Sequence, residues 1–428
     1  MSFSTDVIHG GHIAIIQKAA ALGRLTVGVI ADEVVATYKR FPLLTTQDRM
    51  SIFKNIVGVH DVVRQVSPSG VEIIQALRPD VVVHGDDWRT DFRSPIRQAV
   101  IEALAQYGGR LVEYPSASSR GYDTFEKQAY ASLAIPDIRR GRLKRLLSLK
   151  PLVRAMEASS GLMGLLVEDT KVRVGDKVEQ FDAMWLSSLC DSTAKGKPDI
   201  EVVDFSSRIR TVEDILEVTT KPIIFDADTG GQAEHFAYMM RTLERIGVSA
   251  AIVEDKTGLK RNSLFGAAAE QTQDGIESFC RKIQTGKAAL KTKDTMIIAR
   301  IESLILERGQ EDALARAFAY AGAGADGIMI HSKKKSPDEI FAFCEKFRGR
   351  YDDLPLVVVP STYPSVYEAE LACRGVNLVI YANQLTRSAF PAMRKTAASI
   401  LENGRALEAD SFCLPIQEII RLIPEQGD

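Results

Sequence analysis

Hydrophobic and polar positions alternate with two different periods over the first 128 residues. Three segments carry apolar residues at helical spacing, and three shorter runs are rich in β-branched residues; the helical segments are 13–22, 46–57 and 93–107, and the runs are 25–31, 80–84 and 110–114. Helices that alternate with short apolar strands are typical of a parallel sheet with crossover helices. The pattern therefore predicts an α/β domain at the N-terminal side.

A basic amphipathic stretch follows, with the sequence Ile138-Arg-Arg-Gly-Arg-Leu-Lys-Arg-Leu-Leu. Such a helix can bind a partner or a lipid surface, or it can be a solvated connection between domains. We favour the solvated connection. We expect a first domain over 1–128, a basic helical linker over 129–150 and a second domain over 151–428.

Eight short apolar runs ending in polar residues follow, most of them separated by a helical segment. The runs are 156–158, 184–187, 223–226, 251–255, 297–300, 328–331, 357–360 and 379–383. Eight strand–helix units of this length are what a (β/α)₈ barrel requires, and the alternative is a doubly wound open sheet. In a barrel, polar residues at the C-terminal ends of the strands share one mouth, which is where active sites lie.

Composition limits the functions to consider. The 428 residues are 45% hydrophobic and 26% charged, with a formal net charge of −2, so we expect no nucleic acid and no anionic membrane as the main partner. No apolar run is long enough to span a bilayer, and the first residues do not resemble a signal peptide. The cysteines form no CxxC pair: Cys190, Cys280, Cys344, Cys373 and Cys413. We expect a cytoplasmic protein with reduced thiols.

Carboxylates gather at the ends of two consecutive predicted strands. Asp226 and Asp228 close the third run, and Glu254 and Asp255 close the fourth. A single Asp at such a place is more often a loop cap. Four carboxylates without a neighbouring Cys or His favour a site for Mg²⁺, a hard cation that keeps several waters.

Arg300 ends the fifth run and His331 ends the sixth. The planar fork of Arg300 suits a carboxylate or a phosphoryl group, and His331 can donate to a phosphoryl oxygen or satisfy a core carbonyl. Beside a metal at one mouth, they indicate a small substrate that carries both phosphate and carboxylate.

The segment from Glu254 to Ser263 reads EDKTGLKRNS and matches EDK-x5-NS, so it resembles phosphoenolpyruvate mutases of the isocitrate lyase superfamily. Further segments resemble that family in the same order: MEASSGL from Met156, WLSSL from Trp185, KPD from Lys197, DADTG from Asp226, ARIE from Ala299 and HSK from His331. The resemblance covers about residues 150–405. It implies a TIM-type barrel and Mg²⁺-dependent isomerisation of phosphoenolpyruvate and phosphonopyruvate, which makes the C–P bond in phosphonate biosynthesis.

The resemblance also implies a role for each matching residue. Asp226 would bind Mg²⁺ directly, and Asp199, Asp228 and Glu254 would hold its waters. Substrate contacts would come from Trp185, Ser187, Ser188, Leu189 and Ser263, and catalytic roles would fall to Asp199, Lys260, Asn262, Arg300 and His331. Ser188 stands where the family usually has Gly, and a backbone contact there tolerates Ser if φ is not strongly positive.

Two other activities are compatible with this barrel. The related lyases carry a Cys-containing KKCGH loop at the corresponding position, and this chain has no such Cys, which argues against C–C cleavage. Phosphonopyruvate hydrolase is the main alternative. For either enzyme we expect a homo-oligomer, a dimer or tetramer assembled through the barrel.

The N-terminal segment resembles the cytidylyltransferase fold over about residues 1–115. His9-Gly-Gly-His12 matches HxGH, and Asp86 and Trp88 lie in a GDDW-like element. The resemblance implies a Rossmann-like domain that uses CTP and a phosphonate such as 2-hydroxyethylphosphonate. It places His9, His12, Lys39, Asp86 and Trp88 at the nucleotide, with Arg49 as a further basic contact.

Two departures from that family bear on activity. Only five residues precede Asp6, so we expect the first strand to be missing or encoded further upstream. The phosphate-binding segment after Pro115 is degenerate between Ser116 and Thr124. We expect CMP transfer to be poor or absent, and the alternative is a nucleotide-binding or structural appendage.

Overall fold

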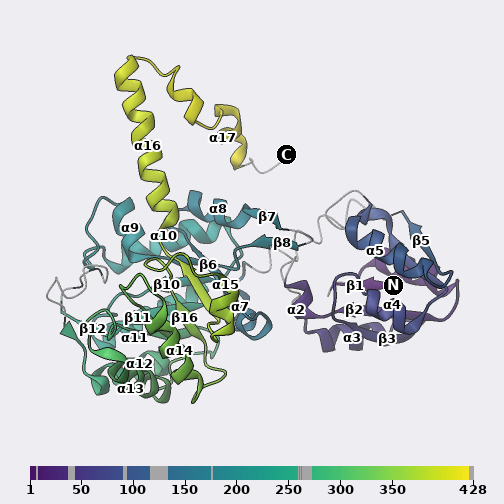
Figure 1. Cartoon of the computed structure of the whole chain (residues 1–428), viewed down its shortest axis with the longest axis horizontal. Helices are drawn as coiled ribbons and strands as arrows, with labels where there is room; N and C mark the ends of the chain where they lie inside the picture. The colour runs from purple at the N-terminus through teal and green to yellow at the C-terminus, as the bar shows by residue number, and fades with distance from the viewer. Residues whose placement is uncertain are drawn as a thin grey trace.

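The structure, a computed structural model, describes residues 1–5, 8–36, 44–89, 94–115, 134–174, 177–258, 260, 262 and 272–423. Two bodies lie along the long axis of the molecule: an N-terminal α/β domain, and a larger barrel from which a long helix projects (Figure 1). Within these ranges, no helix combines the length and the apolar character that a bilayer crossing needs.

Parallel strands form the N-terminal domain, as predicted. Strands β1, β2 and β3 pair in parallel, and so do β4 and β5. Side chains from both sheets, including Phe3, Val27 and Val83, share one apolar core. The elements are β1 Ser2–Phe3, α1 Gly10–Ala20, β2 Leu25–Ile30, α2 Asp32–Val35, α3 Thr46–Lys54, β3 Val59–Gln65, α4 Val71–Leu77, β4 Val81–Gly85, η1 Asp86–Trp88, α5 Ser94–Ala105 and β5 Arg110–Tyr114.

Two sequence-based expectations for this domain need correction. The first strand is not missing, because Ser2 and Phe3 pair in parallel with Gly28 and Val29 of β2. The strand β3 was not predicted, because its sequence VHDVVRQ carries charged residues at its solvent-facing positions, and its two fully buried residues are Val62 and the polar Gln65.

The second body is a closed barrel of eight parallel strands in the order β10-β11-β14-β15-β16-β17-β6-β9. All eight predicted runs form barrel strands, so the predicted (β/α)₈ fold is confirmed and the open doubly wound sheet is excluded. The barrel strands are β6 Val153–Glu157, β9 Ala183–Leu186, β10 Ile223–Asp226, β11 Ala250–Glu254, β14 Met296–Ile301, β15 Gly327–Ile330, β16 Leu356–Val358 and β17 Leu378–Tyr381.

Helices cover the outside of the barrel, and short hairpins decorate two of its loops (Figure 1). These helices are α8 Gly161–Asp169, α9 Ser188–Ala194, α10 Phe205–Val218, α11 Ala233–Ile246, α12 Ile276–Ala289, α13 Gly309–Gly322, α14 Asp338–Arg348 and α15 Glu368–Cys373. The last helix after a barrel strand, α16 Gln384–Asn403, projects away from the barrel. The hairpin strands are β7 Lys171–Val174 with β8 Lys177–Gln180, and β12 Lys256–Thr257 with β13 Thr272–Gln273.

Alternate residues of each barrel strand face opposite sides, as the pleat requires. Ile224, Ile252 and Ile298 belong to the cluster inside the barrel. Their neighbours Phe225 and Val253 pack outward against the helices. This alternation decides which polar residue at the end of each strand enters the mouth.

The basic helix α7 (Pro136–Leu149) is not the solvated connection that its composition suggested. Leu143 and Leu146 join the interior cluster of the barrel, and Arg139 and Arg142 are buried. Arg139 donates to the carbonyl of Thr219 at 2.7 Å, so its charge is satisfied by backbone oxygen rather than by water. The helix therefore belongs to the packed base of the barrel.

The same helix contacts the N-terminal domain. A guanidinium nitrogen of Arg145 lies 3.4 Å from a carboxylate oxygen of Asp32 and 3.3 Å from the carbonyl of Leu44. Ala36, which follows α2, packs with the interior cluster that contains Leu143. The boundary predicted at residue 128 lies outside the described residues, so the domain limits stay a prediction.

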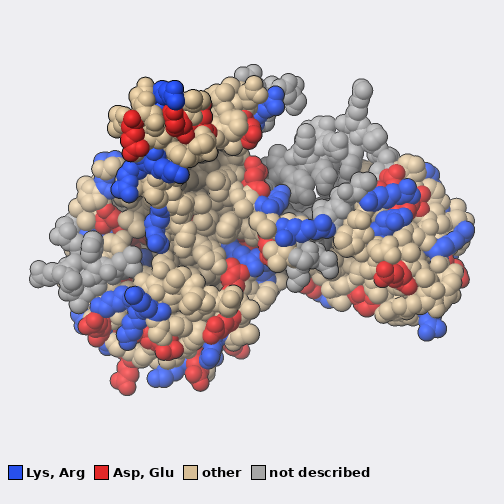
Figure 2. Space-filling view, turned by 45° about the horizontal axis from the view of Figure 1, so that its top comes forward, with Lys and Arg blue, Asp and Glu red and all other residues tan. Residues whose placement is uncertain are grey.

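The C-terminal part of the chain extends away from the barrel. Helix α16 projects outward, and the segment with η3 Ala409–Phe412 and α17 Ile416–Leu422 folds back (Figure 1). Elsewhere, Lys, Arg, Asp and Glu side chains are interspersed on the face that Figure 2 shows, in line with the near-neutral net charge.

Candidate active site

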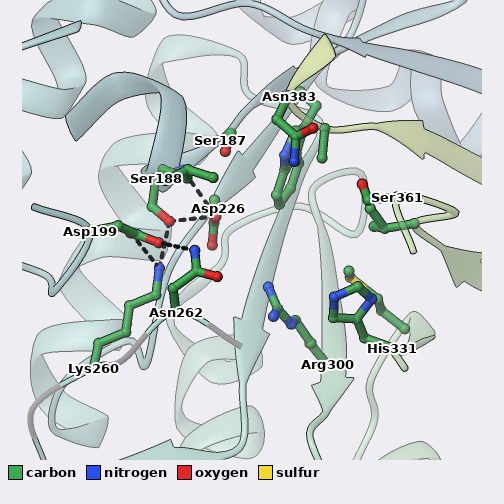
Figure 3. Close-up of a pocket in the computed structure, with 15 residues that line it drawn as sticks. Ser187, Ser188, Asp199, Asp226, Lys260, Asn262, Arg300, His331, Ser361 and Asn383 are labelled. Atoms are coloured by element: carbon green, nitrogen blue, oxygen red, sulfur yellow. Dashed lines mark hydrogen bonds and ion pairs between the residues drawn. The ribbon is translucent and has the colours of Figure 1, made fainter. Parts of the chain in front are cut away.

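A pocket opens at the C-terminal ends of the barrel strands. It gathers ten residues to which the sequence assigned a function: Trp185, Ser187, Ser188, Leu189, Asp199, Asp226, Lys260, Asn262, Arg300 and His331. Five further residues line it without having been predicted: Met329, Val359, Ser361, Ala382 and Asn383. Figure 3 shows carboxylates and Lys260 on one side and Arg300, His331 and Ser361 on the other.

Strand pleating explains why these side chains meet. Asp226 is two residues after the inward-facing Ile224, and Arg300 is two residues after Ile298. His331 follows Met329 by the same step. Residues two apart on a strand share a face, so the interior apolar residue of each strand predicts an inward polar residue at its end.

Asp226 is the centre of the carboxylate side. Its carboxylate accepts from the backbone N–H of Ser188 at 3.0 Å and from the Ser188 hydroxyl at 2.8 Å. Burial alone would raise the pKa of Asp226, but the charges of Lys260, Arg208 and Arg300 bring it below its usual range. Asp226 is therefore ionised at neutral pH.

Ser188, where the resembling family usually has Gly, is accommodated without backbone strain. It is not among the described residues with positive φ, and it begins helix α9. Its hydroxyl donates to Asp226 and accepts from the Lys260 ammonium at 2.5 Å. The extra hydroxyl therefore bridges an anion and a cation of the pocket.

Asp228 sits in a strained turn just beyond the strand. Its φ is +51°, in the left-handed region that non-glycine residues rarely adopt and that Asp tolerates better than most. Arg208 of α10 donates to the Asp228 carboxylate at 2.8 Å and to the backbone carbonyl of Asp226 at 2.6 Å. No local sequence pattern marks Arg208, which lies on a helix eighteen positions before Asp226.

The EDK-x5-NS segment supplies two side chains to the same side. The Lys260 ammonium lies 3.1 Å from Asp199 and also pairs with Asp228. The Asn262 amide donates to the other Asp199 oxygen at 2.7 Å. Burial lowers the pKa of Lys260, but the surrounding carboxylates, Asp228 first among them, raise it well above the usual value. Ser263 lies outside the described residues.

Glu254 is the observation that bears most directly on a metal. It is 1% exposed, and neither carboxylate oxygen has a hydrogen-bond partner among the described residues. Lys256 and Arg300 approach these oxygens only to 3.6 Å. Burial raises the pKa of Glu254. Buried oxygens without donors are costly, and a hydrated cation would satisfy them.

The donor set fits Mg²⁺ rather than a metal held by many protein ligands. Within the described part of the chain, no three His, Cys, Asp or Glu side chains gather closely enough to hold an ion alone. Mg²⁺ usually keeps several waters and takes only one or two carboxylates from the protein. This coordination preference is compatible with Asp226 as a direct ligand and with Asp228 and Glu254 close to the waters of the ion.

Asp255 does not join this group, contrary to expectation. It follows Glu254 on the strand, so the pleat turns it outward into a buried network. Its carboxylate accepts from Tyr320 at 2.8 Å and from Gln273 at 2.9 Å, and it lies 3.2 Å from Arg316. Burial raises its pKa to about 7. Asp255 therefore stabilises the end of β11 through contacts outside the barrel.

Arg300 and His331 form the opposite side of the pocket. Arg300 is oriented by Glu302, whose carboxylate accepts from its Nε at 2.6 Å. Burial, followed by the nearby charge of Arg300, lowers the pKa of His331 to about 4. A neutral imidazole next to a charged guanidinium can donate one hydrogen bond and accept another.

This shift of the His331 pKa has a measurable consequence for stability. The folded pKa of about 4 lies below the ordinary value of 6.5, so the unfolded chain binds the proton first as pH falls. Stability is therefore lost between pH 6.5 and 4, by about 2 kcal/mol at pH 5. The replacement His331→Gln should remove this loss. The melting temperature of each protein drops from pH 7 to pH 5, and the drop should be roughly 4 °C smaller for His331→Gln than for the wild type.

Thermal unfolding of both proteins at pH 7 and pH 5 tests this expectation. The control is His60→Gln, which replaces a histidine exposed on β3 in the other domain. Parallel pH dependence of wild type and His331→Gln would contradict it.

In the N-terminal domain, the HxGH segment begins helix α1, which starts three residues earlier than the predicted segment 13–22. His9 is the N-cap of α1, and its Nδ1 accepts from the backbone N–H of Gly11 at 3.0 Å. The rings of His9 and His12 lie 3.8 Å apart between centroids. Backbone N–H groups at a helix start favour phosphate groups. Lys39 lies outside the described residues.

The GDDW-like element has a structural partner. Asp86 begins η1, and Trp88, which ends it, is buried and donates through its indole N–H to Glu113 at 2.7 Å. Arg89 and Arg97 also donate to this carboxylate, at 2.8 Å and 2.9 Å. The hydrogen bond from Arg97 is the main reason why the pKa of Glu113 lies well below its usual range.

Arg49, the further basic residue of the sequence analysis, is buried. A nitrogen of its guanidinium lies 2.5 Å from a carboxylate oxygen of Asp32.

A closed (β/α)₈ barrel whose charged residues converge on its C-terminal mouth is an enzyme architecture. Comparison with known families defines that enzyme more closely. The phosphoenolpyruvate phosphomutase family matches residues 143–401, and the chain belongs to this family. Residues 4–116 match the cytidylyltransferase-like family, so both resemblances seen in the sequence are confirmed.

Relatives with two different activities are similar to this chain. Phosphonopyruvate hydrolase of Variovorax sp. (strain Pal2) is 37% identical over 279 residues, 65% of this chain and 91% of the relative. A crystal structure of phosphoenolpyruvate phosphomutase from Streptomyces platensis subsp. rosaceus is 33% identical with a TM-score of 0.60, over 66% of this chain and 93% of that one. Phosphonopyruvate hydrolase in complex with oxalate and Mg²⁺ is 35% identical with a TM-score of 0.59, over 66% and 94%.

The protein is thus an enzyme of the phosphoenolpyruvate mutase and isocitrate lyase superfamily with an added cytidylyltransferase-like domain. Overall similarity does not separate mutase from hydrolase, because relatives of both kinds match at similar identity.

Proposed function

We propose that the barrel interconverts phosphoenolpyruvate and phosphonopyruvate and requires Mg²⁺. One observation carries the proposal: Lys260 and Asn262 of the EDK-x5-NS segment reach the same pocket as Arg300 and His331. A pocket with a carboxylate side and a cationic side suits a small substrate that carries phosphoryl and carboxylate groups.

Asp226, Asp228, Glu254 and Asp199 are the proposed metal side. Asp226 would bind Mg²⁺ directly, and the other three would hold its waters. When bound, Mg²⁺ would neutralise negative charge on the substrate oxygens. The role proposed for Asp199 includes a second task, because it also holds Asn262 and Lys260 by hydrogen bonds.

The remaining groups act on the substrate itself. Phosphoryl transfer passes through a loose state whose charge lies on the equatorial oxygens. Arg300 and His331 would bind those oxygens, with His331 neutral and donating one hydrogen bond. Ser187, Ser188 and Leu189 would hold the carboxylate end beside Trp185. Lys260 and Asn262 would cover the substrate and keep out water, which otherwise captures the phosphoryl group.

Hydrolysis of phosphonopyruvate is the second candidate, favoured by the 37% identity to a hydrolase. ³¹P NMR of the enzyme with Mg²⁺ and phosphonopyruvate separates the two, since C–P and O–P resonances differ widely. We expect phosphoenolpyruvate to appear. Inorganic phosphate without phosphoenolpyruvate would make the protein a hydrolase, and an unchanged spectrum would refute both.

For the N-terminal domain we propose CTP binding with slow CMP transfer to a phosphonate. The adjacent rings of His9 and His12 support binding. Slow transfer is expected because Glu113 engages Arg89 and Arg97, two cations near the C-terminal edge of the sheet. Pyrophosphate release from CTP with 2-hydroxyethylphosphonate or 2-aminoethylphosphonate measures it. Release as fast as barrel turnover, lost in His12→Ala, would contradict slow transfer.

We also propose that copies of this chain associate through α16. This helix exposes large apolar side chains, with Phe390 61%, Met393 63% and Leu401 85% accessible. Exposed apolar area of this kind marks an interaction surface. Light scattering should give a mass at least twice the 47.1 kDa of one chain.

A further inference from the structure

Ser361 is a pocket residue to which neither the sequence pattern nor the proposed mechanism gives a task. It follows strand β16, two residues after Val359 and four after Val357, both of which face the barrel interior. The pleat therefore aims it into the mouth. It lines the pocket on the side of Arg300 and His331, away from Asp199 and Lys260 (Figure 3).

The hydroxyl of Ser361 is buried and has no hydrogen-bond partner among the described residues. The Nδ1 atom of His331, on the adjacent strand, is in the same condition. Leaving a buried donor or acceptor unsatisfied is unfavourable, and native proteins rarely do so without a functional reason. Two such atoms at one side of a pocket indicate a polar group of a ligand between them.

The backbone around Ser361 is fixed by its neighbour. The hydroxyl of Thr362 donates to the carbonyl of Ser332 at 2.8 Å, and Tyr363 is fully buried. Ser332 directly follows His331, so this contact ties the segment after β16 to the segment after β15. Ser361 and His331 are therefore held beside one another by the protein before any ligand binds.

Charge decides which ligand group fits there. A serine hydroxyl and a neutral imidazole can each donate one hydrogen bond, and the Arg300 guanidinium adds positive charge. Met329, Val359 and Ala382 add apolar surface to the pocket, and Asn383 adds an amide. Several donors with one cation, set in apolar walls, suit the multiple oxygens of a tetrahedral phosphoryl or phosphonate group.

We propose that Ser361 contacts the substrate and donates a hydrogen bond to its phosphoryl end, beside Arg300 and His331. This inference rests on the proposed function. It assigns the Ser361 hydroxyl to the phosphoryl end of the substrate and not to its carboxylate end. Ser361 does not contact the metal side, so its effect is confined to ligands that carry the tetrahedral group.

Calorimetric titration of the Mg²⁺-loaded enzyme with two ligands tests the proposal. 3-Phosphonopropionate carries a phosphonate and a carboxylate but lacks the keto group, and oxalate carries carboxylates only. A hydrogen bond to a charged group is worth a tenfold to hundredfold change in affinity, in order of magnitude. The replacement Ser361→Ala should weaken 3-phosphonopropionate about tenfold or more and leave oxalate within about twofold.

The conservative variant Ser361→Thr keeps the hydroxyl and should retain most of the affinity for 3-phosphonopropionate. Equal weakening of both ligands in Ser361→Ala would show a merely structural role, and unchanged affinity for both would show no contact; either result overturns the proposal. Failure of the wild type to bind 3-phosphonopropionate overturns it as well. Turnover of phosphonopyruvate by the wild type is measured separately, so failure of the proposed function is recognised independently.

Discussion

The replacement Asp226→Asn should reduce turnover of phosphonopyruvate by at least about a thousandfold, because it removes the proposed direct ligand of Mg²⁺ and several kcal/mol of charge stabilisation. Asp226 is the ionised carboxylate at the centre of the metal side, held by Ser188 and surrounded by cations. The carboxamide keeps a similar shape, so the fold should persist. Turnover is followed by ³¹P NMR over a range of Mg²⁺ concentrations.

The matched control is Asp182→Asn. Asp182 is also buried and paired, with Lys150 at 2.6 Å, but it precedes β9 and therefore lies at the opposite end of the barrel from the pocket. It should keep near-normal turnover even if its melting temperature falls. Full activity of the wild type in excess EDTA, or of Asp226→Asn at any Mg²⁺ concentration, would refute the metal assignment.

The replacement Asn262→Ala should lower the rate at which phosphonopyruvate and phosphoenolpyruvate are interconverted by about a hundredfold or more, because the amide would position the reacting group. Stability should change little, since the side chain is half-buried and its hydrogen bond to Asp199, at 2.7 Å, is worth about 1 kcal/mol. Activity and melting temperature are measured on the same preparation.

Asn403→Ala provides the comparison for this variant. Asn403 ends α16, where its amide donates to the carbonyl of Ser399 at 2.8 Å, and the helix projects away from the barrel (Figure 1). Deleting this amide should leave turnover unchanged. Wild-type rates in Asn262→Ala would mean that the EDK-x5-NS segment is not catalytic here, and the mutase proposal would lose its main support.

Polar residues at strand ends were predicted well where the strand pattern was strong. Asp226, Arg300 and His331 each end an apolar run, and each reaches the pocket. Asp255 shows the limit of this reasoning: it neighbours Glu254 in sequence, yet the pleat sends the two carboxylates to opposite faces of the strand. The positions of charged residues in the sequence do not predict these faces. The strand alternation does, because Glu254 is two residues after the inward-facing Ile252 and Asp255 is two residues after the outward-facing Val253.

Ser361 could have been found in the same way, because it has the parity of Val357 and Val359. Arg208 could not. Its helix approaches Asp226 and Asp228 only once α10 has packed on the barrel, and no local pattern marks it. The burial of α7 was likewise hidden, since its arginines are satisfied by backbone carbonyls that belong to residues about 80 positions away.

The sequence by itself determined the two-domain α/β architecture, the eight barrel strands and the family, because hydrophobic periodicity and local motifs are properties of consecutive residues. Only the tertiary structure decided which carboxylates share the pocket and that Ser188 bridges Asp226 and Lys260. It also decided that Ser361 and His331 each bring to one side a buried polar atom without a hydrogen-bond partner in the described part of the chain. These features depend on strands and helices far apart in the chain. The side chains of these distant segments come close to one another only when the barrel closes, and a pattern of consecutive residues does not predict such contacts.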